Sequence, residues 1–169
     1  AYRFSGYWKD VGTIDSLWDA NMDMLAVDSG VQLFDPTWPI YARTPTKPPH
    51  FMGSKAVVSH SMVTGGCEVY GEVENSVLFH SVRVEEGAQV KYSILMPGAV
   101  VKAGAVVEYA IVAENAVIGE GAWVGAPPED DKPEEWGIAV VAEGIKVGDG
   151  ARIPAKSMVT RNVKSGGVR

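Results

Sequence analysis

An aspartate near the start of the chain lies in a setting that suits metal chemistry. The stretch "GYWKDVGT" (residues 6–13) places Asp10 between an aromatic pair and a Gly-Thr turn. A carboxylate of this kind can be a ligand of Mg²⁺, which typically takes one or two carboxylates together with substrate phosphates. It can equally accept hydrogen bonds from the backbone N–H groups of the turn that follows. The residues alone leave both interpretations open.

Other side chains could bind anions or transfer protons. Arg43, Lys47, Arg83 and Lys102 are candidates for holding a phosphorylated effector, because cations recognise phosphates, with solvated surface charge as the alternative. His80 is a candidate general base for acyl transfer. Three histidines can form a catalytic zinc site, but of His50, His60 and His80 only His80 lies inside a full unit of the repeat described below, and His60 just precedes the first copy. Surface histidines are the alternative.

Composition narrows the class of protein. Apolar residues make up 46% of the 169 residues and charged residues 21%, which indicates a folded, globular chain. The net charge of −6 and the scattered Lys and Arg argue against nucleic-acid binding. One cysteine excludes an internal disulfide and favours a cytoplasmic location. We expect no membrane span and no signal peptide. The first residue is Ala1, so the chain can be a processed protein, a truncation or a natural fragment.

The element following the Asp10 motif is predicted to be an amphipathic helix over residues 13–27. Thr13 is a good N-cap, and Asp15 lies in the first turn, where the helix dipole favours a carboxylate. Apolar residues then follow helical spacing, with Asn21 as the one polar interruption.

Residues 31–60 contain five prolines and are predicted to form an extended arm. Proline lacks a backbone N–H and fixes φ, so this segment suits neither a helix nor a central strand. Trp38, Ile40 and Tyr41 are expected to dock the arm onto another part of the molecule.

An internal repeat occupies residues 61–154. A short first copy reads "SMVTGGCEVYGEVEN", and the later units read "SVLFHSVRVEEGAQVKY", "SILMPGAVVKAGAVVEY", "AIVAENAVIGEGAWVG" and "AVVAEGIKVGDGARIP". Aliphatic residues recur at the third, ninth and fifteenth places, and Gly-Ala pairs fill places twelve and thirteen. The aliphatic positions are Val63, Leu78, Leu95, Val112 and Val141; Val69, Val84, Val101, Ile118 and Val147; and Val90, Val107, Val124 and Ile153.

This spacing of six, six and five residues predicts a hexapeptide β-helix. Each unit would form one turn of a three-sided coil, with three short strands that each send one aliphatic side chain inward. Helical spacing of three and four does not fit, and a β-sandwich is the alternative fold. The acidic, proline-rich insert 126–138 is expected to loop out at a corner, with Trp136 folding back onto a face.

The order of these parts resembles a known enzyme family. "GYWKDVGTIDSLWDANMDML", then "LFDPTWPIYARTP", then a hexapeptide coil opening "SMVTGGCEV" is similar to the C-terminal portion of glucose-1-phosphate adenylyltransferase (ADP-glucose pyrophosphorylase). The resemblance divides the chain into a remnant of the catalytic domain (1–30), a linker arm (31–60) and a β-helix domain (61–169), and it implies a left-handed β-helix.

The resemblance also implies a role for each motif residue. The family makes ADP-glucose and pyrophosphate from ATP and glucose 1-phosphate for glycogen or starch synthesis. Asp10 would help to hold Mg²⁺ together with a carboxylate outside this chain, and Trp8 would lie near the sugar-phosphate pocket. The family's glycine-rich nucleotide loop, its other metal-binding aspartate and its glucose 1-phosphate lysine have no counterpart here. We therefore expect a fragment that is inactive alone and that forms a homo-oligomer, a tetramer in the full enzyme.

Two other functions remain open at this stage. The chain could be a free-standing hexapeptide acyltransferase with His80 as base, or a noncatalytic β-helix partner subunit. The intact "DVGT" favours the catalytic type over a partner subunit. Activator binding is not favoured by residues 93–109, where Lys102 is the one outward cation.

Overall fold

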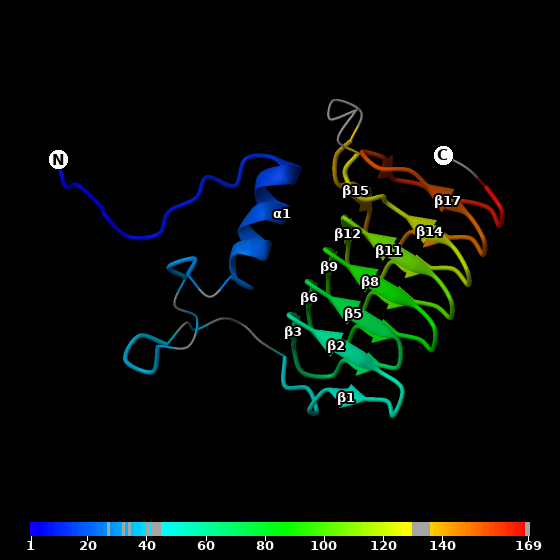
Figure 1. Ribbon diagram of the computed structural model, residues 1–169, viewed down its shortest axis with the longest axis horizontal. Helices are drawn as coiled ribbons and strands as arrows, with labels where there is room; N and C mark the ends of the chain where they lie inside the picture. Colours follow the sequence, from blue (N-terminus) through cyan, green and yellow to red (C-terminus); the bar gives the residue numbers. More distant parts are fainter. Residues whose placement is uncertain are drawn as a thin grey trace.

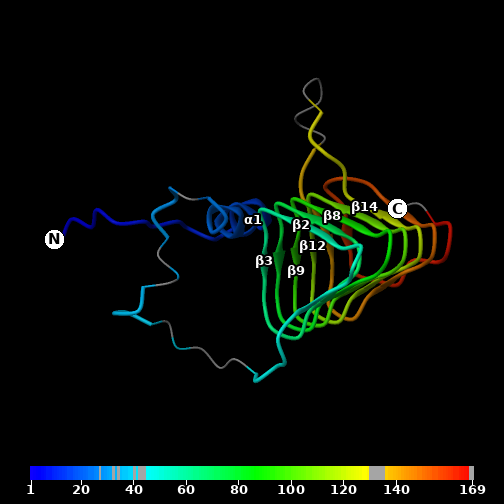
Figure 2. The same ribbon diagram turned by 60° about the horizontal axis from the view of Figure 1, so that its bottom comes forward.

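A computed structural model describes residues 1–26, 28–31, 33, 35–39, 41, 45–129 and 136–167. Within these residues the chain forms one helix, α1 (Ile14–Asp23), followed by a coil of short parallel strands with three sides (Figures 1 and 2). Side A comprises β1 (Phe51–Met52), β4 (Glu68–Val69), β7 (Arg83–Val84), β10 (Val100–Val101), β13 (Val117–Ile118) and β16 (Lys146–Val147).

The other two sides have the same number of strands. Side B comprises β2 (Val57–Ser59), β5 (Glu72–Glu74), β8 (Gln89–Lys91), β11 (Val106–Glu108), β14 (Trp123–Val124) and β17 (Arg152–Ile153). Side C comprises β3 (Met62–Val63), β6 (Val77–Leu78), β9 (Ile94–Leu95), β12 (Ala110–Val112), β15 (Ala139–Val141) and β18 (Met158–Val159). Consecutive strands change side, so each turn pairs with the turn before it.

The predicted aliphatic columns form the core of the coil. On side A, Val101 pairs in register with Val84 and Ile118, and all three side chains are fully buried. On side B, Val107 lies in the same way between Val90 and Val124. The β-helix prediction is therefore confirmed, as are its inward positions, although Val63 in the first copy is only partly buried. The left hand of the coil stays a prediction.

A ladder of serines completes the hydrogen bonding at the corner between sides B and C. The Ser76 hydroxyl donates to the Glu74 carbonyl at 2.7 Å and accepts from the Ser93 N–H at 3.1 Å. The Ser93 hydroxyl repeats this pattern one turn later, donating to the Lys91 carbonyl and accepting from the Ala110 N–H. Both serines are fully buried, so each hydroxyl satisfies backbone groups that water cannot reach.

The coil begins at Phe51, whereas the sequence pattern placed its start at residue 61. Strands β1 and β2 lie within residues 31–60, where an arm was predicted, and they pair with β4 and β5. The arm reaches the coil at Gly66, whose N–H donates to the Pro48 carbonyl at 2.7 Å. A Cβ at Gly66 would lie 3.2 Å from Cβ of Lys47, and its φ is +75°. Glycine is therefore favoured at this crossing both by space and by backbone conformation.

Helix α1 packs along the outer face of side C (Figures 1 and 2). Its apolar stripe, which includes Leu17 and Trp18, contacts a cluster centred on Ile94, Ile111 and Ile138. The Trp18 indole N–H also donates to the Tyr92 carbonyl at 2.7 Å. The helix is shorter than the predicted 13–27 span, because Met24 caps its C-terminus. No helix in the described part of the chain is long and apolar enough to cross a membrane.

The insert between β14 and β15 leaves the coil continuous. Ala110 of β12 still pairs with Ala139 of β15, so the next turn stacks in register after the insert. Trp136 folds back as predicted, because its indole N–H donates to the Ala126 carbonyl at 2.8 Å and its ring meets Tyr109 edge-on. Residues 130–135 lie outside the described residues.

Candidate functional site: the Asp10 segment and its helix

The segment that carries Trp8 and Asp10 leads directly into α1. Thr13 is the N-cap, and its hydroxyl oxygen accepts from the Ser16 N–H at 3.2 Å, while the Thr13 N–H donates to the Ser16 hydroxyl at 2.9 Å. These reciprocal bonds form a capping box, here completed by serine, which holds the entry to the helix. The predicted cap at Thr13 is confirmed.

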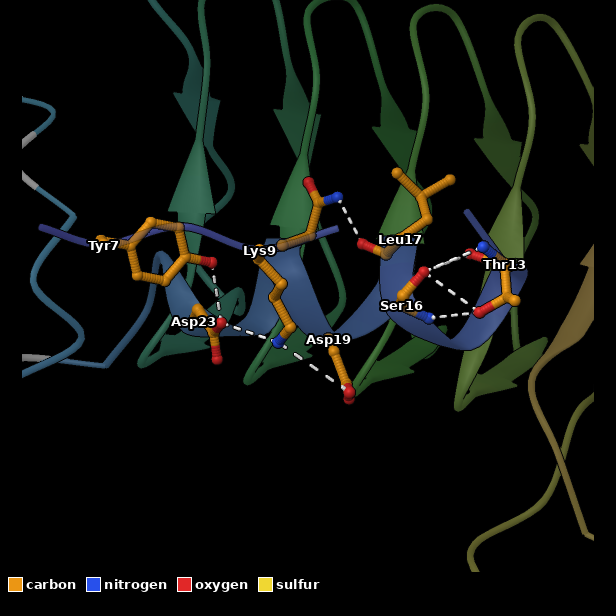
Figure 3. Close-up of polar contacts among 8 residues, drawn as sticks. Tyr7, Lys9, Thr13, Ser16, Leu17, Asp19 and Asp23 are labelled. Carbon is orange, nitrogen blue, oxygen red and sulfur yellow. Dashed lines mark hydrogen bonds and ion pairs between the residues drawn. The ribbon is translucent and has the colours of Figure 1, made fainter. Parts of the chain in front are cut away.

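Asp23, at the far end of the helix, accepts two hydrogen bonds from the segment before it (Figure 3). The Tyr7 hydroxyl lies 2.9 Å from Oδ2 of Asp23, and Nζ of Lys9 lies 2.8 Å from the same oxygen. Asp19 is a looser neighbour of Lys9, at 3.9 Å. We call Tyr7, Lys9 and Asp23 the Asp23 clamp.

The hydrogen bonds of the Asp23 clamp shift the pKa values of all three of its side chains. The hydrogen bonds from Lys9 and then Tyr7 hold the pKa of Asp23 below its ordinary value of 3.8. The bond to Asp23 raises the pKa of Lys9 above 10.5 and that of Tyr7 above 10.0. On the acid side, the clamp stabilises the fold above pH 3.8, and this contribution is lost as pH falls through the lowered pKa of Asp23. On the alkaline side, it is lost as pH rises through the raised pKa values of Tyr7 and Lys9.

The two predicted site residues between these anchors are exposed. The Trp8 side chain is 75% exposed, and Asp10 is also exposed. In the described part of the chain the Asp10 carboxylate has no hydrogen bond or ion pair, so the bonds to the backbone of "VGT" that were the alternative are not formed. A hard cation prefers such an oxygen donor, and one carboxylate fits one ligand position of Mg²⁺. No group of three His, Cys, Asp or Glu side chains suited to a metal occurs among the described residues.

A cleft of about 400 Å³ lies beside Tyr7. Its lining combines the start of the chain with the arm and includes Phe4, Val31, Leu33 and Trp38. Trp38 and Tyr41 are 82% and 91% exposed, so the expectation that they dock the arm is wrong for this chain, and Ile40 lies outside the described residues.

The candidate effector cations within the described residues differ in their surroundings. Arg83 is committed to neighbours, with its guanidinium 2.7 Å from Glu68 and 3.5 Å from Glu85 and stacked over Tyr70. Lys102 is exposed directly after β10, as predicted, and Lys47 lies at the arm's crossing of the coil. Arg43 lies outside the described residues.

The histidines do not converge. His50 and His60 are exposed, and His60 hydrogen-bonds Asn75 at 2.6 Å. Nδ1 of His80 lies 3.4 Å from the Ser81 hydroxyl, a contact too long to activate a base strongly. The geometry therefore adds no support for a zinc site or for acyl transfer by His80.

The sequence pattern did not reveal the Asp23 clamp, nor the stacked pair of Tyr92 and Tyr109 at a corner of the coil, which we call the aromatic corner. Asp23 lies 16 residues from Tyr7 and 14 from Lys9, so no local motif announces the contacts. The aromatic corner did leave a signal, because Tyr92 and Tyr109 end two successive units of the repeat. Their rings stack with centroids 4.7 Å apart, and both residues have positive φ.

A comparison with protein families identifies the coil. The family model described as "GlmU-like, C-terminal hexapeptide" matches residues 47–148, more than half of the chain. The chain belongs to this hexapeptide family. The match starts just before β1, which agrees with a coil that begins at Phe51.

Curated relatives of this chain carry the name glucose-1-phosphate adenylyltransferase. The Bacillus mycoides (strain KBAB4) protein is 50% identical over 99 residues, covering 59% of this chain and 26% of the relative. The Clostridium perfringens (strain SM101 / Type A) protein is 52% identical over 97 residues, covering 57% and 25%. The resemblance in the sequence is thus confirmed. The chain spans about a quarter of the length of these relatives.

Proposed function

We propose that the chain is the C-terminal part of a glucose-1-phosphate adenylyltransferase, which forms ADP-glucose and pyrophosphate from ATP and glucose 1-phosphate. The observation that carries this proposal is the identity of about half the residues, over nearly 100 positions, with relatives of that name. The exposed Asp10 segment before the coil supports it, because that segment suits a metal-dependent reaction on phosphates.

In this proposal the residues of the chain have defined tasks. The Asp10 carboxylate would hold one position of Mg²⁺, with a second carboxylate supplied by the longer protein. The bound metal would neutralise charge on the phosphates during nucleotidyl transfer. Trp8 would form part of the wall of the sugar-phosphate pocket, where an exposed indole offers a flat apolar surface to a sugar ring.

The coil would serve assembly and support. It offers α1 a rigid apolar face and exposes an apolar first turn suited to contact with another subunit. We infer a homo-oligomer acting in the cytoplasm in glycogen or starch synthesis. Effector binding at Lys47 or Lys102 would need basic residues from the longer protein, because Arg83 is already paired with acids.

A synthesis assay tests the proposal. The longer protein, supplied with ATP, glucose 1-phosphate and Mg²⁺, should release pyrophosphate and form ADP-glucose, and the 169-residue chain should do neither. Acetyl-CoA should not raise the melting temperature of the chain, whereas a clear rise would favour an acyltransferase. A longer protein that is inactive alone, but raises the activity of a second subunit, would identify a noncatalytic partner.

A further inference from the structure

The start of the chain is attached to the rest of the described structure through few polar contacts. Between Ala1 and Gly12 the side-chain hydrogen bonds and ion pairs to described residues are those of Tyr7 and Lys9 with Asp23 and the longer contact of Lys9 with Asp19. Within the described part of the chain these twelve residues form no backbone–backbone hydrogen bond. Asp23 is therefore the principal polar anchor of the segment that carries Trp8 and Asp10.

Asp23 occupies a position that the helix itself disfavours. It is the last residue of α1, where the negative end of the helix dipole repels a carboxylate, and no basic residue lies in that turn. The bonds to Lys9 and Tyr7 offset this repulsion. The side chains of Lys9 and Asp23 are only 27% and 33% exposed, so water competes less for this pair than for a fully exposed one.

The clamp and the helix cap hold the two ends of a short stretch. Tyr7 and Lys9 reach Asp23, and Thr13 is fixed by its capping box with Ser16. Trp8 and Asp10 lie between these anchors in the sequence and remain exposed. Tyr7 and Lys9 thus attach the segment to the helix, while Trp8 and Asp10 are exposed to solvent.

The helix that carries Asp23 is itself fixed to the coil. The indole N–H of Trp18 donates to the Tyr92 carbonyl, and the apolar stripe of the helix packs against side C. A continuous path therefore runs from the coil through α1 and Asp23 to the segment around Asp10. A side chain that is already fixed in this way loses less conformational entropy when it binds a ligand.

We propose that Asp23 is a positioning residue, which fixes the Asp10 carboxylate and the Trp8 ring through Lys9 and Tyr7 so that metal and sugar phosphate meet a preformed surface. This inference rests on the proposed function. Asp23 does not touch the reactants and acts only through the segment that it anchors.

The first test measures order in the 169-residue chain. Backbone ¹⁵N relaxation should give order parameters for residues 7–12 that fall to below about 0.6 in Asp23→Asn, a value typical of flexible backbone. Asp19→Asn, which removes a charge from the same helix at the longer contact, should leave them near the wild-type values. Lys9→Met should behave like Asp23→Asn, whereas Lys9→Arg should retain order because arginine can still donate to Asp23. Unchanged order in Asp23→Asn would overturn the proposal.

The second test uses the longer enzyme. Asp23→Asn should raise the half-saturating Mg²⁺ concentration and the KM for glucose 1-phosphate by about tenfold, because small misplacements of binding groups have effects of this size or more. The kcat at saturating Mg²⁺ should stay within about twofold, and Lys9→Arg should preserve both constants near their wild-type values. Loss of order without a change in either constant would refute the positioning role. A wild-type enzyme that makes no ADP-glucose would instead refute the proposed function, and the relaxation data would still decide whether Asp23 orders the segment.

Discussion

At the scale of single residues, the chain has two kinds of polar group: exposed groups that are free to bind a ligand, and buried groups whose hydrogen bonds water cannot replace. Asp10 exemplifies the first kind, because its carboxylate is exposed and has no partner in the described part of the chain. Ser93 exemplifies the second, because its buried hydroxyl serves backbone groups of two turns. Substitutions at the two positions should therefore affect different properties, activity at Asp10 and stability at Ser93.

Asp10→Asn should lower the activity of the longer enzyme without unfolding it. An amide is a weaker ligand for Mg²⁺ than a carboxylate, and we expect kcat to fall by about 10²-fold or more, which corresponds to about 2.7 kcal/mol of barrier. The loss should diminish as Mg²⁺ is raised, because mass action refills a weaker site. Steady-state kinetics across a Mg²⁺ series measures both effects, and normal rates at low Mg²⁺ would show that Asp10 is not a ligand.

Ser93→Ala should destabilise the coil by about 1–3 kcal/mol, the cost of leaving a buried donor without a partner. The donor is the Ala110 N–H, which lies 3.1 Å from the Ser93 hydroxyl. Urea unfolding followed by circular dichroism gives the free energy of unfolding. Ser59→Ala, at an exposed residue of β2, is the matched control and should change that free energy little. Equal effects of the two substitutions would contradict the serine ladder.

Residue roles were predictable from the sequence where they repeat and unpredictable where they are unique. The columns of Val101 and Val107 were predictable because each unit of the coil presents the same environment at the same place. The start of the coil was missed because Lys55 stands where later units have the glycine of the Gly-Ala pair, although Ala56 packs against the core as its counterparts do. Asp23 was missed because its partners depend on how the chain folds back, which no local pattern encodes.

At the scale of elements, each strand of the coil is defined by which side chain faces inward. Val101→Asp should cost about 3–5 kcal/mol, because it buries a carboxylate that has no partner. Lys102→Asp, one residue later and exposed, should change the free energy of unfolding by about 0.5 kcal/mol or less. Denaturant unfolding of the two variants compares them directly, and similar losses would mean that the strand register is wrong.

The attachment of α1 to the coil can be weakened while the coil stays intact. Trp18→Phe keeps an aromatic ring in the apolar cluster but removes the donor to the Tyr92 carbonyl, at a cost of about 1 kcal/mol. Hydrogen exchange should then accelerate in the amides of α1 and remain slow in the central strands. Trp123→Phe, on the outer face of side B, should leave α1 unchanged. Faster exchange throughout the coil after Trp18→Phe would show that the helix is part of one cooperative unit.

At the scale of the whole molecule, the first turn of the coil presents apolar surface on strands that are paired along one edge only. Phe51 is 55% exposed and Val57 58% exposed, and β1, β2 and β3 each lie at the edge of their side. Such edges tend to pair with other chains unless they are covered.

We therefore expect the chain to associate with itself. Light scattering should show a mass that rises with concentration above that of the 18.1 kDa monomer. Val57→Lys should shift this association to higher concentration, because a charge at an edge strand opposes pairing. A strict monomer at high concentration would place the assembly surface outside this chain.

The two ends of the insert at residues 126–138 are held together, so the length of the insert need not affect how the turns of the coil stack. The Trp136 indole and the Ala126 carbonyl meet at the corner, and the next turn resumes in register with β12. The entropy of closing a loop grows only slowly with its length, by about 0.6 kcal/mol for each doubling. A foreign sequence inserted between Glu129 and Trp136 should therefore leave the stacking of the turns on either side unchanged. This corner is a point where the protein can gain a new module without redesign of its core.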